Sequence, residues 1–328
     1  VSHGGAVRVE NDGILLMEDS TLESNKAEYG GAVFAYSGAK IILQVGTTSY
    51  VKGNTADRGG AFYLDGAGTH LDVSGQDTKL VVEENTATGR GGGLAAVAAA
   101  IITVSTGAKM NVTKNTADYA GGFYLQNTGT RLNVVGKDTK LFMVENVATT
   151  GHGGGAWVCA ESLISISSGA TVACERNSAS SSGGCLLVQK SELQINGPDT
   201  KFLVDDNTAQ SGGGLAFMVQ ASATISDSAV VKIARNSALQ DGGGIKYRDD
   251  SSIKVSGSGT KLIVEQNTAT TSGGGIYGQT GASFLVDTSA VLEVKNNVAE
   301  KHGGGIGLTD QGTFLNLIDK SSQAIVIG

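Results

Sequence analysis

The chain of 328 residues contains one proline, Pro198, one tryptophan and three cysteines. Without a Gly-X-Y period or abundant proline it is not collagen-like. It also lacks a run of eighteen apolar residues, which excludes a membrane-spanning helix in this segment. Lys and Arg number 24 against 31 Asp and Glu, so the positive surplus typical of nucleic-acid-binding surfaces is missing. We therefore expect neither a nucleic-acid partner nor a membrane span.

Glycine is the residue present in excess, with 49 copies. Hydrophobic residues make up 40% of the chain and charged residues 17%, a balance that is typical of a folded protein with a buried core. Glycine at this level without disorder-promoting composition indicates that the backbone needs it at fixed places.

A short phrase repeats along the whole chain. It consists of an apolar residue, two variable residues, Asn, any residue and Ala, followed by two or three glycines and an apolar run. The Asn recurs every 29 to 31 residues, and repetition at one period is the signature of a solenoid. The repeated residues are Asn25, Asn54, Asn85, Asn115, Asn146, Asn177, Asn207, Asn236, Asn267 and Asn297.

Between these phrases the apolar residues alternate as in β-strands. Leu71 and Val73 flank Asp72, and Leu80 and Val82 precede Glu83, so that apolar side chains fall on one face. The pattern predicts an all-β fold, a right-handed parallel β-helix of ten to eleven turns with three short strands per turn. We expect residues 1–328 to form a single β-helix segment that is part of a longer polypeptide.

The ten Asn residues are predicted to form a structural column at one corner of the coil. Asn and Gly tolerate the left-handed backbone angles of a sharp corner, and stacked Asn side chains can hydrogen-bond from turn to turn.

The stretch "VKGNTADRGGAFYL" from Val51 to Leu64 resembles the paired Gly-Gly-Ala-aliphatic and Phe-x-x-Asn repeats of the polymorphic outer-membrane proteins. The resemblance extends from Gly4 to Gly305, with aliphatic residues in place of the Phe. It implies a bacterial surface β-helix that serves in adhesion or in building a cell-surface layer.

No group of residues has the composition or spacing of an active site. His3, His152 and His302 lie about five turns apart and do not share a metal, and Ser, His and Asp do not combine in a nucleophile motif. The sequence therefore predicts no catalytic residue, no cofactor and no metal. Cys174 and Cys185 are interpreted as buried small hydrophobes, with a disulfide among the three cysteines left open.

Apolar residues also fall at positions that counting from the last glycine places on the outer face of the first strand. Such a stripe indicates contact with a partner or with a covering segment of the same polypeptide. The candidate interface residues are Val33, Phe62, Leu64, Tyr124, Trp157, Leu186 and Met218.

These observations favour a non-enzymatic, extracellular or cell-surface rod with a structural or adhesive role. Its partner is then protein, either a second copy or another surface protein, and carbohydrate is a further candidate. One alternative is a subunit of a surface filament that assembles laterally or end to end. A second alternative is a β-helix that binds or cleaves polysaccharide.

Overall fold

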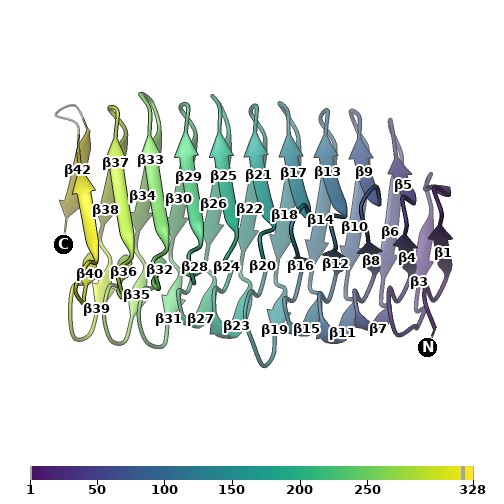
Figure 1. The fold of residues 1–328 in the computed structure, drawn as a ribbon, viewed down its shortest axis with the longest axis horizontal. Helices are drawn as coiled ribbons and strands as arrows, with labels where there is room; N and C mark the ends of the chain where they lie inside the picture. The colour runs from purple at the N-terminus through teal and green to yellow at the C-terminus, as the bar shows by residue number, and fades with distance from the viewer. Residues whose placement is uncertain (1, 319–321, 328) are drawn as a thin grey trace.

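A computed structural model describes residues 2–318 and 322–327 of the chain. Its regular elements are β-strands, and every strand pairing is parallel, each strand lying beside its counterpart one turn later. The turns follow one another along the long axis, with the two ends of the chain at opposite ends of the rod (Figure 1). No helix in the described part of the chain has the length and apolar character needed to cross a membrane.

The described strands form four sheets. The first sheet follows the glycines and contains β1 (Val7–Glu10), β4 (Val33–Tyr36), β8 (Phe62–Asp65), β12 (Leu94–Val97), β16 (Phe123–Gln126), β20 (Ala156–Cys159), β24 (Leu186–Gln189), β28 (Leu215–Met218), β32 (Ile245–Tyr247), β36 (Ile276–Gly278) and β40 (Ile306–Leu308).

The second sheet comes next in each turn. It contains β2 (Ile14–Leu16), β5 (Lys40–Leu43), β9 (His70–Ser74), β13 (Ile101–Ser105), β17 (Arg131–Val135), β21 (Leu163–Ser167), β25 (Glu192–Asn196), β29 (Ser222–Ser226), β33 (Ser252–Ser256), β37 (Ser283–Asp287) and β41 (Phe314–Leu317).

The third sheet precedes the repeated Asn. It contains β3 (Thr21–Glu23), β6 (Thr48–Lys52), β10 (Lys79–Glu83), β14 (Lys109–Thr113), β18 (Lys140–Val144), β22 (Thr171–Glu175), β26 (Lys201–Asp205), β30 (Val230–Ala234), β34 (Lys261–Glu265), β38 (Val291–Lys295) and β42 (Gln323–Ile327).

The fourth sheet lies between the Asn and the glycines. It contains β7 (Thr55–Arg58), β11 (Thr86–Arg90), β15 (Thr116–Tyr119), β19 (Val147–Ala148), β23 (Ser178–Ser182), β27 (Thr208–Ser211), β31 (Ser237–Ala238), β35 (Thr268–Ala269) and β39 (Val298–Ala299). The predicted parallel β-helix of about eleven turns is confirmed, but most turns have four strands rather than three. The extra strand was missed because its inward residue is a single Ala, as at Ala56 and Ala117, so it lacks the alternating larger apolar residues of the other strands.

The interior is filled by one hydrophobic core that runs the length of the rod. Strand β9 shows the pattern behind it: Leu71 and Val73 are fully buried, whereas Asp72 between them points outward and stays partly exposed. Because parallel pairing keeps equivalent residues in register, each inward side chain packs on its counterparts in the neighbouring turns.

The Asn column is a continuous ladder of hydrogen bonds at the corner between the third and fourth sheets. Asn115 donates from its backbone N–H and from its Nδ2 to Oδ1 of Asn146, both at 3.0 Å. Asn146 makes the same two bonds to Asn177, and its Nδ2 also donates to the carbonyl of Val112 at 2.8 Å. The Asn side chain therefore replaces backbone pairing where the chain turns.

The left-handed residue of this corner is not the Asn but the residue before it. Glu84, Lys114, Glu145 and Arg176 have φ between 52° and 58°. The predicted conformational reason for Asn is therefore wrong. Asn is required at this corner for its side-chain hydrogen bonds. The residue before it, whose type varies from turn to turn, takes the left-handed backbone angle.

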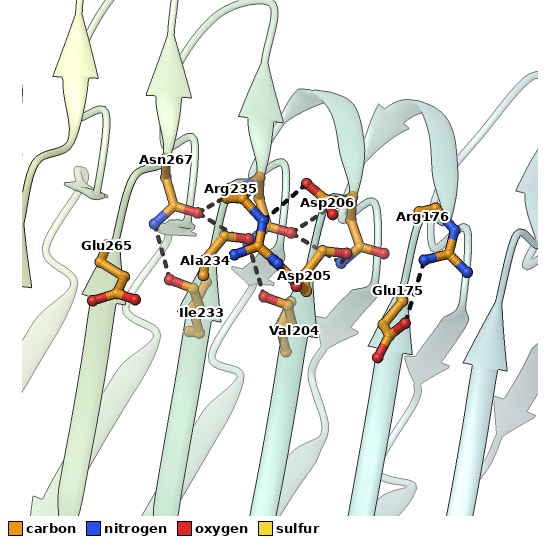
Figure 2. Close-up of polar contacts among 12 residues, drawn as sticks. Glu175, Arg176, Val204, Asp205, Asp206, Ile233, Ala234, Arg235, Glu265 and Asn267 are labelled. Atoms are coloured by element: carbon orange, nitrogen blue, oxygen red, sulfur yellow. Dashed lines mark hydrogen bonds and ion pairs between the residues drawn. The ribbon is translucent and has the colours of Figure 1, made fainter.

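Exposed ion pairs join neighbouring turns beside the ladder. Arg176 Nε lies 3.1 Å from Glu145 Oε1 in the preceding turn. Figure 2 shows Arg235 in contact with both Asp205 and Asp206. Solvent-exposed pairs of this kind contribute roughly 0.2–1 kcal/mol each, so they add little to the stability of the corner.

The three residues that directly precede each strand of the first sheet form a corner, which we call the glycine corner. The middle position is glycine in every turn, because it packs directly on the backbone of the next turn: a Cβ on Gly60 would lie 2.1 Å from the carbonyl oxygen of Gly92. The third position holds glycine in most turns and Ala or Cys in others, as at Ala32, Ala61 and Cys185. The hydrogen bond from the N–H of Ala61 to the carbonyl oxygen of Gly93 shows that these two residues occupy the same position in neighbouring turns.

Cys174 and Cys185 form a disulfide inside the core, with their Cα atoms 5.8 Å apart. Cys174 is the inward residue three before Asn177, and Cys185 takes the third glycine-corner position, which faces it across the coil. Both are fully buried, as the sequence indicated, but they are bonded to each other rather than free. Cys159 is the free cysteine and is buried.

Candidate functional site

The predicted interface stripe mixes residues from both faces of the first sheet. Val33, Phe62, Leu64 and Leu186 are at most 1% exposed and belong to the core, so their expected outward orientation is wrong. Tyr124, Trp157 and Met218 do lie outside the core, on the outer face.

The physical reason for this error is the glycine corner. Ala6, Ala32, Ala61 and Cys185 occupy a corner position that is glycine in the other turns, so counting from the last glycine shifts these turns by one residue. A shift of one residue exchanges the two faces of a strand. The register pairs Val33 with Phe62 and Phe34 with Tyr63, which makes Phe34 and Tyr63 the outward residues.

A second hydrophobic cluster lies outside the core, on the outer face of the first sheet. Its aromatic residues come from the outward positions of the strands and from the residue just before the first glycine-corner position. We call it the outer aromatic band: His3, Tyr29, Phe34, Tyr36, Tyr63, Tyr119, Tyr124, His152 and Trp157. It covers the first six turns, the purple to teal part of Figure 1.

The N-terminal part of the band is a chain of ring contacts. His3 stacks on Tyr29 with ring centroids 5.3 Å apart, and Tyr29 meets Tyr63 edge-on at 5.0 Å. Tyr63 in turn lies parallel to Phe34 at 5.7 Å, and the guanidinium of Arg58 lies 5.8 Å from the Tyr29 ring. Offset and edge-on pairs of this kind, together with cation–π contacts, fix the rings in place.

The central part of the band surrounds Trp157. The Trp157 ring lies 5.4 Å from Tyr124, 5.7 Å from Tyr119 and 5.7 Å from His152. Arg90 lies 5.1 Å from the Tyr124 ring and donates a hydrogen bond of 2.8 Å to its hydroxyl. Burial raises the pKa of Tyr124, which therefore stays protonated in this cluster.

Two polar atoms of the central part have no hydrogen-bond partner among the residues that the structure describes. Nδ1 of His152 and Nε1 of Trp157 are both shielded from solvent and unpaired. Burial lowers the pKa of His152, and the positive charge of Arg248 adds to this effect. Beside these shielded atoms, the rings of Tyr119 and Trp157 keep partly exposed surface that a binding partner can contact.

The last five turns carry a different outer surface at the same positions. Ser182, Ser211, Asp241 and Ser272 take the position before the glycines in four of these turns, and His302 takes it in the last one. Here Lys246 is buried, with its Nζ 3.2 Å from both Asp241 Oδ2 and Ser211 Oγ. Burial lowers the pKa of Lys246, while Asp241 opposes that change.

The ten Asn residues of the ladder face the corner rather than the outer face of the first sheet. Asn54 through Asn267 are fully buried, and their hydrogen bonds go to one another and to backbone carbonyls. Within residues 2–318 and 322–327, no three His, Cys, Asp or Glu side chains gather closely enough to hold a metal ion. The outer aromatic band is thus the surface best suited to contact a partner.

Sequence reasoning missed most of this band because it numbered the strands from the glycines. Numbering from the middle glycine of each corner, and not from the last one, aligns His3, Tyr29, Tyr119 and His152 in one column with the arginines between them. The signal in the sequence was the recurrence of aromatic and basic residues directly before the first glycine-corner position.

Comparison with known proteins gives one match to a protein family. Residues 261–279 match the Chlamydia polymorphic membrane protein repeat. No curated protein matches the chain. Among solved structures, a crystal structure of the TibC-catalyzed hyper-glycosylated TibA55-350 fragment is similar at 14% sequence identity, over 98% of this chain and 100% of that chain. Its TM-score is 0.24, so this likeness carries no argument about fold or function.

Proposed function

We propose that this chain is a non-enzymatic β-helix rod of a cell surface, which adheres to a partner through the outer aromatic band. The observation that carries the proposal is the second hydrophobic cluster, because it lies outside the core of a coil whose inward side chains already fill the interior. Clustered aromatic and arginine side chains are the groups that dominate binding energy in protein interfaces.

The coil itself does not need these rings. The seventh to tenth turns form the same strands and corners with serine or aspartate at the position before the glycines. An aromatic surface that the fold does not require is therefore best explained by contact with another molecule.

Two further observations support a surface location. The repeat matched at residues 261–279 is named for membrane proteins of Chlamydia. The buried disulfide between Cys174 and Cys185 favours export, because such bonds persist in oxidising compartments and are rare in the cytosol.

This proposal is tested by comparing how two matched variants of the chain adhere to cells. In the first variant Tyr29, Tyr119 and Trp157, which are partly exposed, are all changed to Ser. In the control, Tyr50 and Phe142 on the outer face of the third sheet are changed to Ser. Beads coated with each protein are then applied to a panel of cultured cells, and circular dichroism verifies the fold.

We expect the band variant to lose adhesion and the control to keep it, with both retaining the β-sheet spectrum. Equal adhesion of the two variants would contradict the proposal, as would a wild-type chain that adheres to none of the cells. Sedimentation velocity on the same samples separates a second copy of the chain from a foreign partner. Concentration-dependent dimers that disappear only in the band variant would identify self-association.

A further inference from the structure

A hollow of about 390 Å³ opens on the N-terminal part of the outer aromatic band. Its size falls within the range of roughly 300–1,000 Å³ that is common for small-molecule sites. Three adjacent turns contribute to it, so parallel pairing fixes the spacing of its walls. The lining residues are His3, Glu28, Tyr29, Phe34, Arg58, Tyr63 and Asp65.

The aromatic part of the hollow is rigid. Phe34 and Tyr63 are only 6% and 7% exposed, because they stack on each other and against the sheet. Tyr29 is more exposed and stands beside them, edge-on to Tyr63. These side chains already occupy fixed rotamers, so a ligand that packs on them does not have to order them.

The polar part of the hollow has unused hydrogen-bonding capacity. The carboxylates of Glu28 and Asp65 make no ion pair or hydrogen bond with any residue that the structure describes. Asp65 is partly buried, and this burial raises the pKa of its carboxyl group. Arg58 adds guanidinium donors, and its nearest acidic group is Asp57 at 3.7 Å.

This combination fits a sugar better than a cation or an anion. Sugar hydroxyls both donate and accept hydrogen bonds, so they can pair with carboxylates and with a guanidinium in one site, while the C–H face of the ring packs on aromatic carbons. Two carboxylates against one guanidinium disfavour sulfated or carboxylated sugars. A cationic ligand would be repelled by the guanidinium of Arg58, which lies 5.8 Å from the Tyr29 ring.

We propose that this hollow binds an uncharged hexopyranose unit of a surface glycan. The carboxylates of Glu28 and Asp65 accept hydrogen bonds from its hydroxyls, Arg58 donates to its oxygens, and Tyr29 contacts its apolar face. The proposal rests on the proposed function in that it assigns the adhesive partner of the N-terminal part of the band to carbohydrate.

Saturation-transfer NMR on the full chain tests this site. The probes are the methyl glycosides of glucose, galactose, mannose and N-acetylglucosamine, together with sialic acid and glucuronic acid as charged competitors. We expect at least one neutral glycoside to bind and neither acidic sugar to do so. Asp65→Asn should weaken that binding at least tenfold, because a carboxylate acceptor is lost.

The matched control is Asp138→Asn, the same chemical change at an exposed corner far from the hollow. It should leave sugar binding unchanged, and circular dichroism should be the same for all three proteins. The proposal is overturned if no neutral glycoside binds the folded chain, if acidic sugars bind equally well, or if Asp65→Asn binds like the wild type.

The same variants separate this inference from the proposed function. Beads carrying Asp65→Asn that still adhere to cells, while the wild type binds no sugar, would leave the adhesive rod standing and remove its sugar site. Loss of adhesion for the Tyr29, Tyr119 and Trp157 variant, with adhesion unaffected by free glycoside, would assign the band to a protein partner instead. Wild-type beads that neither adhere nor bind sugar would contradict both.

Discussion

The first six turns and the last five turns of this rod share their corners and differ in their outer surface. Both halves have the Asn ladder, the glycine corner and an inward apolar column. On the outer face of the first sheet, however, the first half carries the outer aromatic band with Arg58 and Arg90 over its rings. The second half carries Ser and Asp before most of its glycines, and the buried Lys246 lies over the ring of Tyr277.

This difference separates the residues that the fold of the coil requires from the residues that only form its surface. Side chains that point inward or lie at a corner meet the next turn directly, so they are restricted to a few residue types. Outward side chains meet only their neighbours in the column, so their chemistry is free to vary between turns. The aromatic half is therefore where a binding role is best sought.

The largest expected effect comes from the corner that both halves share. A Cβ on Gly60 would lie 2.1 Å from the Gly92 carbonyl oxygen, and one on Gly243 would lie 2.3 Å from that of Thr268. Changing either residue to Ala should lower the free energy of unfolding by about 3–5 kcal/mol, because the backbone must move apart. Urea unfolding of each variant measures this.

The control is Gly46→Ala, where no atom lies within 4 Å of the added Cβ and only its left-handed φ of 80° carries a penalty. That change should cost about 1–2 kcal/mol. Unequal losses at Gly60 and Gly243 would show that the two halves do not share one corner.

The second expected effect concerns the Asn ladder. Asn146→Leu removes the acceptor for two donors of Asn115 and leaves the Val112 carbonyl without the Nδ2 donor. Buried groups without partners should lower the free energy of unfolding by about 2–4 kcal/mol. Asn133→Leu, on the outer face of the second sheet, should change it by less than ~0.5 kcal/mol. Denaturation midpoints that do not differ between the two variants would mean that the ladder adds no stability.

The smallest expected effect distinguishes the aromatic half by its response to pH. Burial lowers the pKa of His152 from its ordinary value of 6.5, so the folded chain favours the neutral imidazole. The unfolded chain takes up the proton at higher pH, and the stability contributed by His152 is therefore present above pH 6.5 and lost as the pH falls through its folded value.

His152→Gln should flatten this decline, because glutamine does not titrate. Trp157 and Tyr119 enclose the imidazole, and Arg248 adds positive charge nearby. Urea midpoints of wild type and variant, measured from pH 7.5 to pH 5, give the comparison. Parallel curves for the two proteins would show that His152 does not contribute to acid sensitivity.

The repeat made most of the fold predictable from sequence. The Asn spacing set the number of turns, and alternation of the kind seen at Leu71 and Val73 set the inward face of the second and third sheets. The fourth sheet was not predictable, because the inward residue of its strands is a single Ala, as at Ala56, so they lack the alternating larger apolar residues of the other strands.

The outer surface was predictable only in part, because it depends on register. Ala61 in a glycine position moved Phe62 into the core and left Tyr63 outside, a difference that composition does not reveal. The disulfide depended on register too, since it requires Cys185 at the corner position that faces Cys174. Local patterns give the period of a solenoid, whereas the contacts between turns require the alignment of every corner.

The most direct test of the adhesive role is a footprint of the bound rod. Hydroxyl-radical labelling of the wild-type chain, free and bound to the cells that it adheres to, reports which side chains become protected. We predict protection of Tyr29, Tyr119 and Trp157, with Tyr50 and the exposed Leu239 labelled equally in both states. Protection confined to Tyr50 or Leu239, with the outer aromatic band still labelled, would contradict the account.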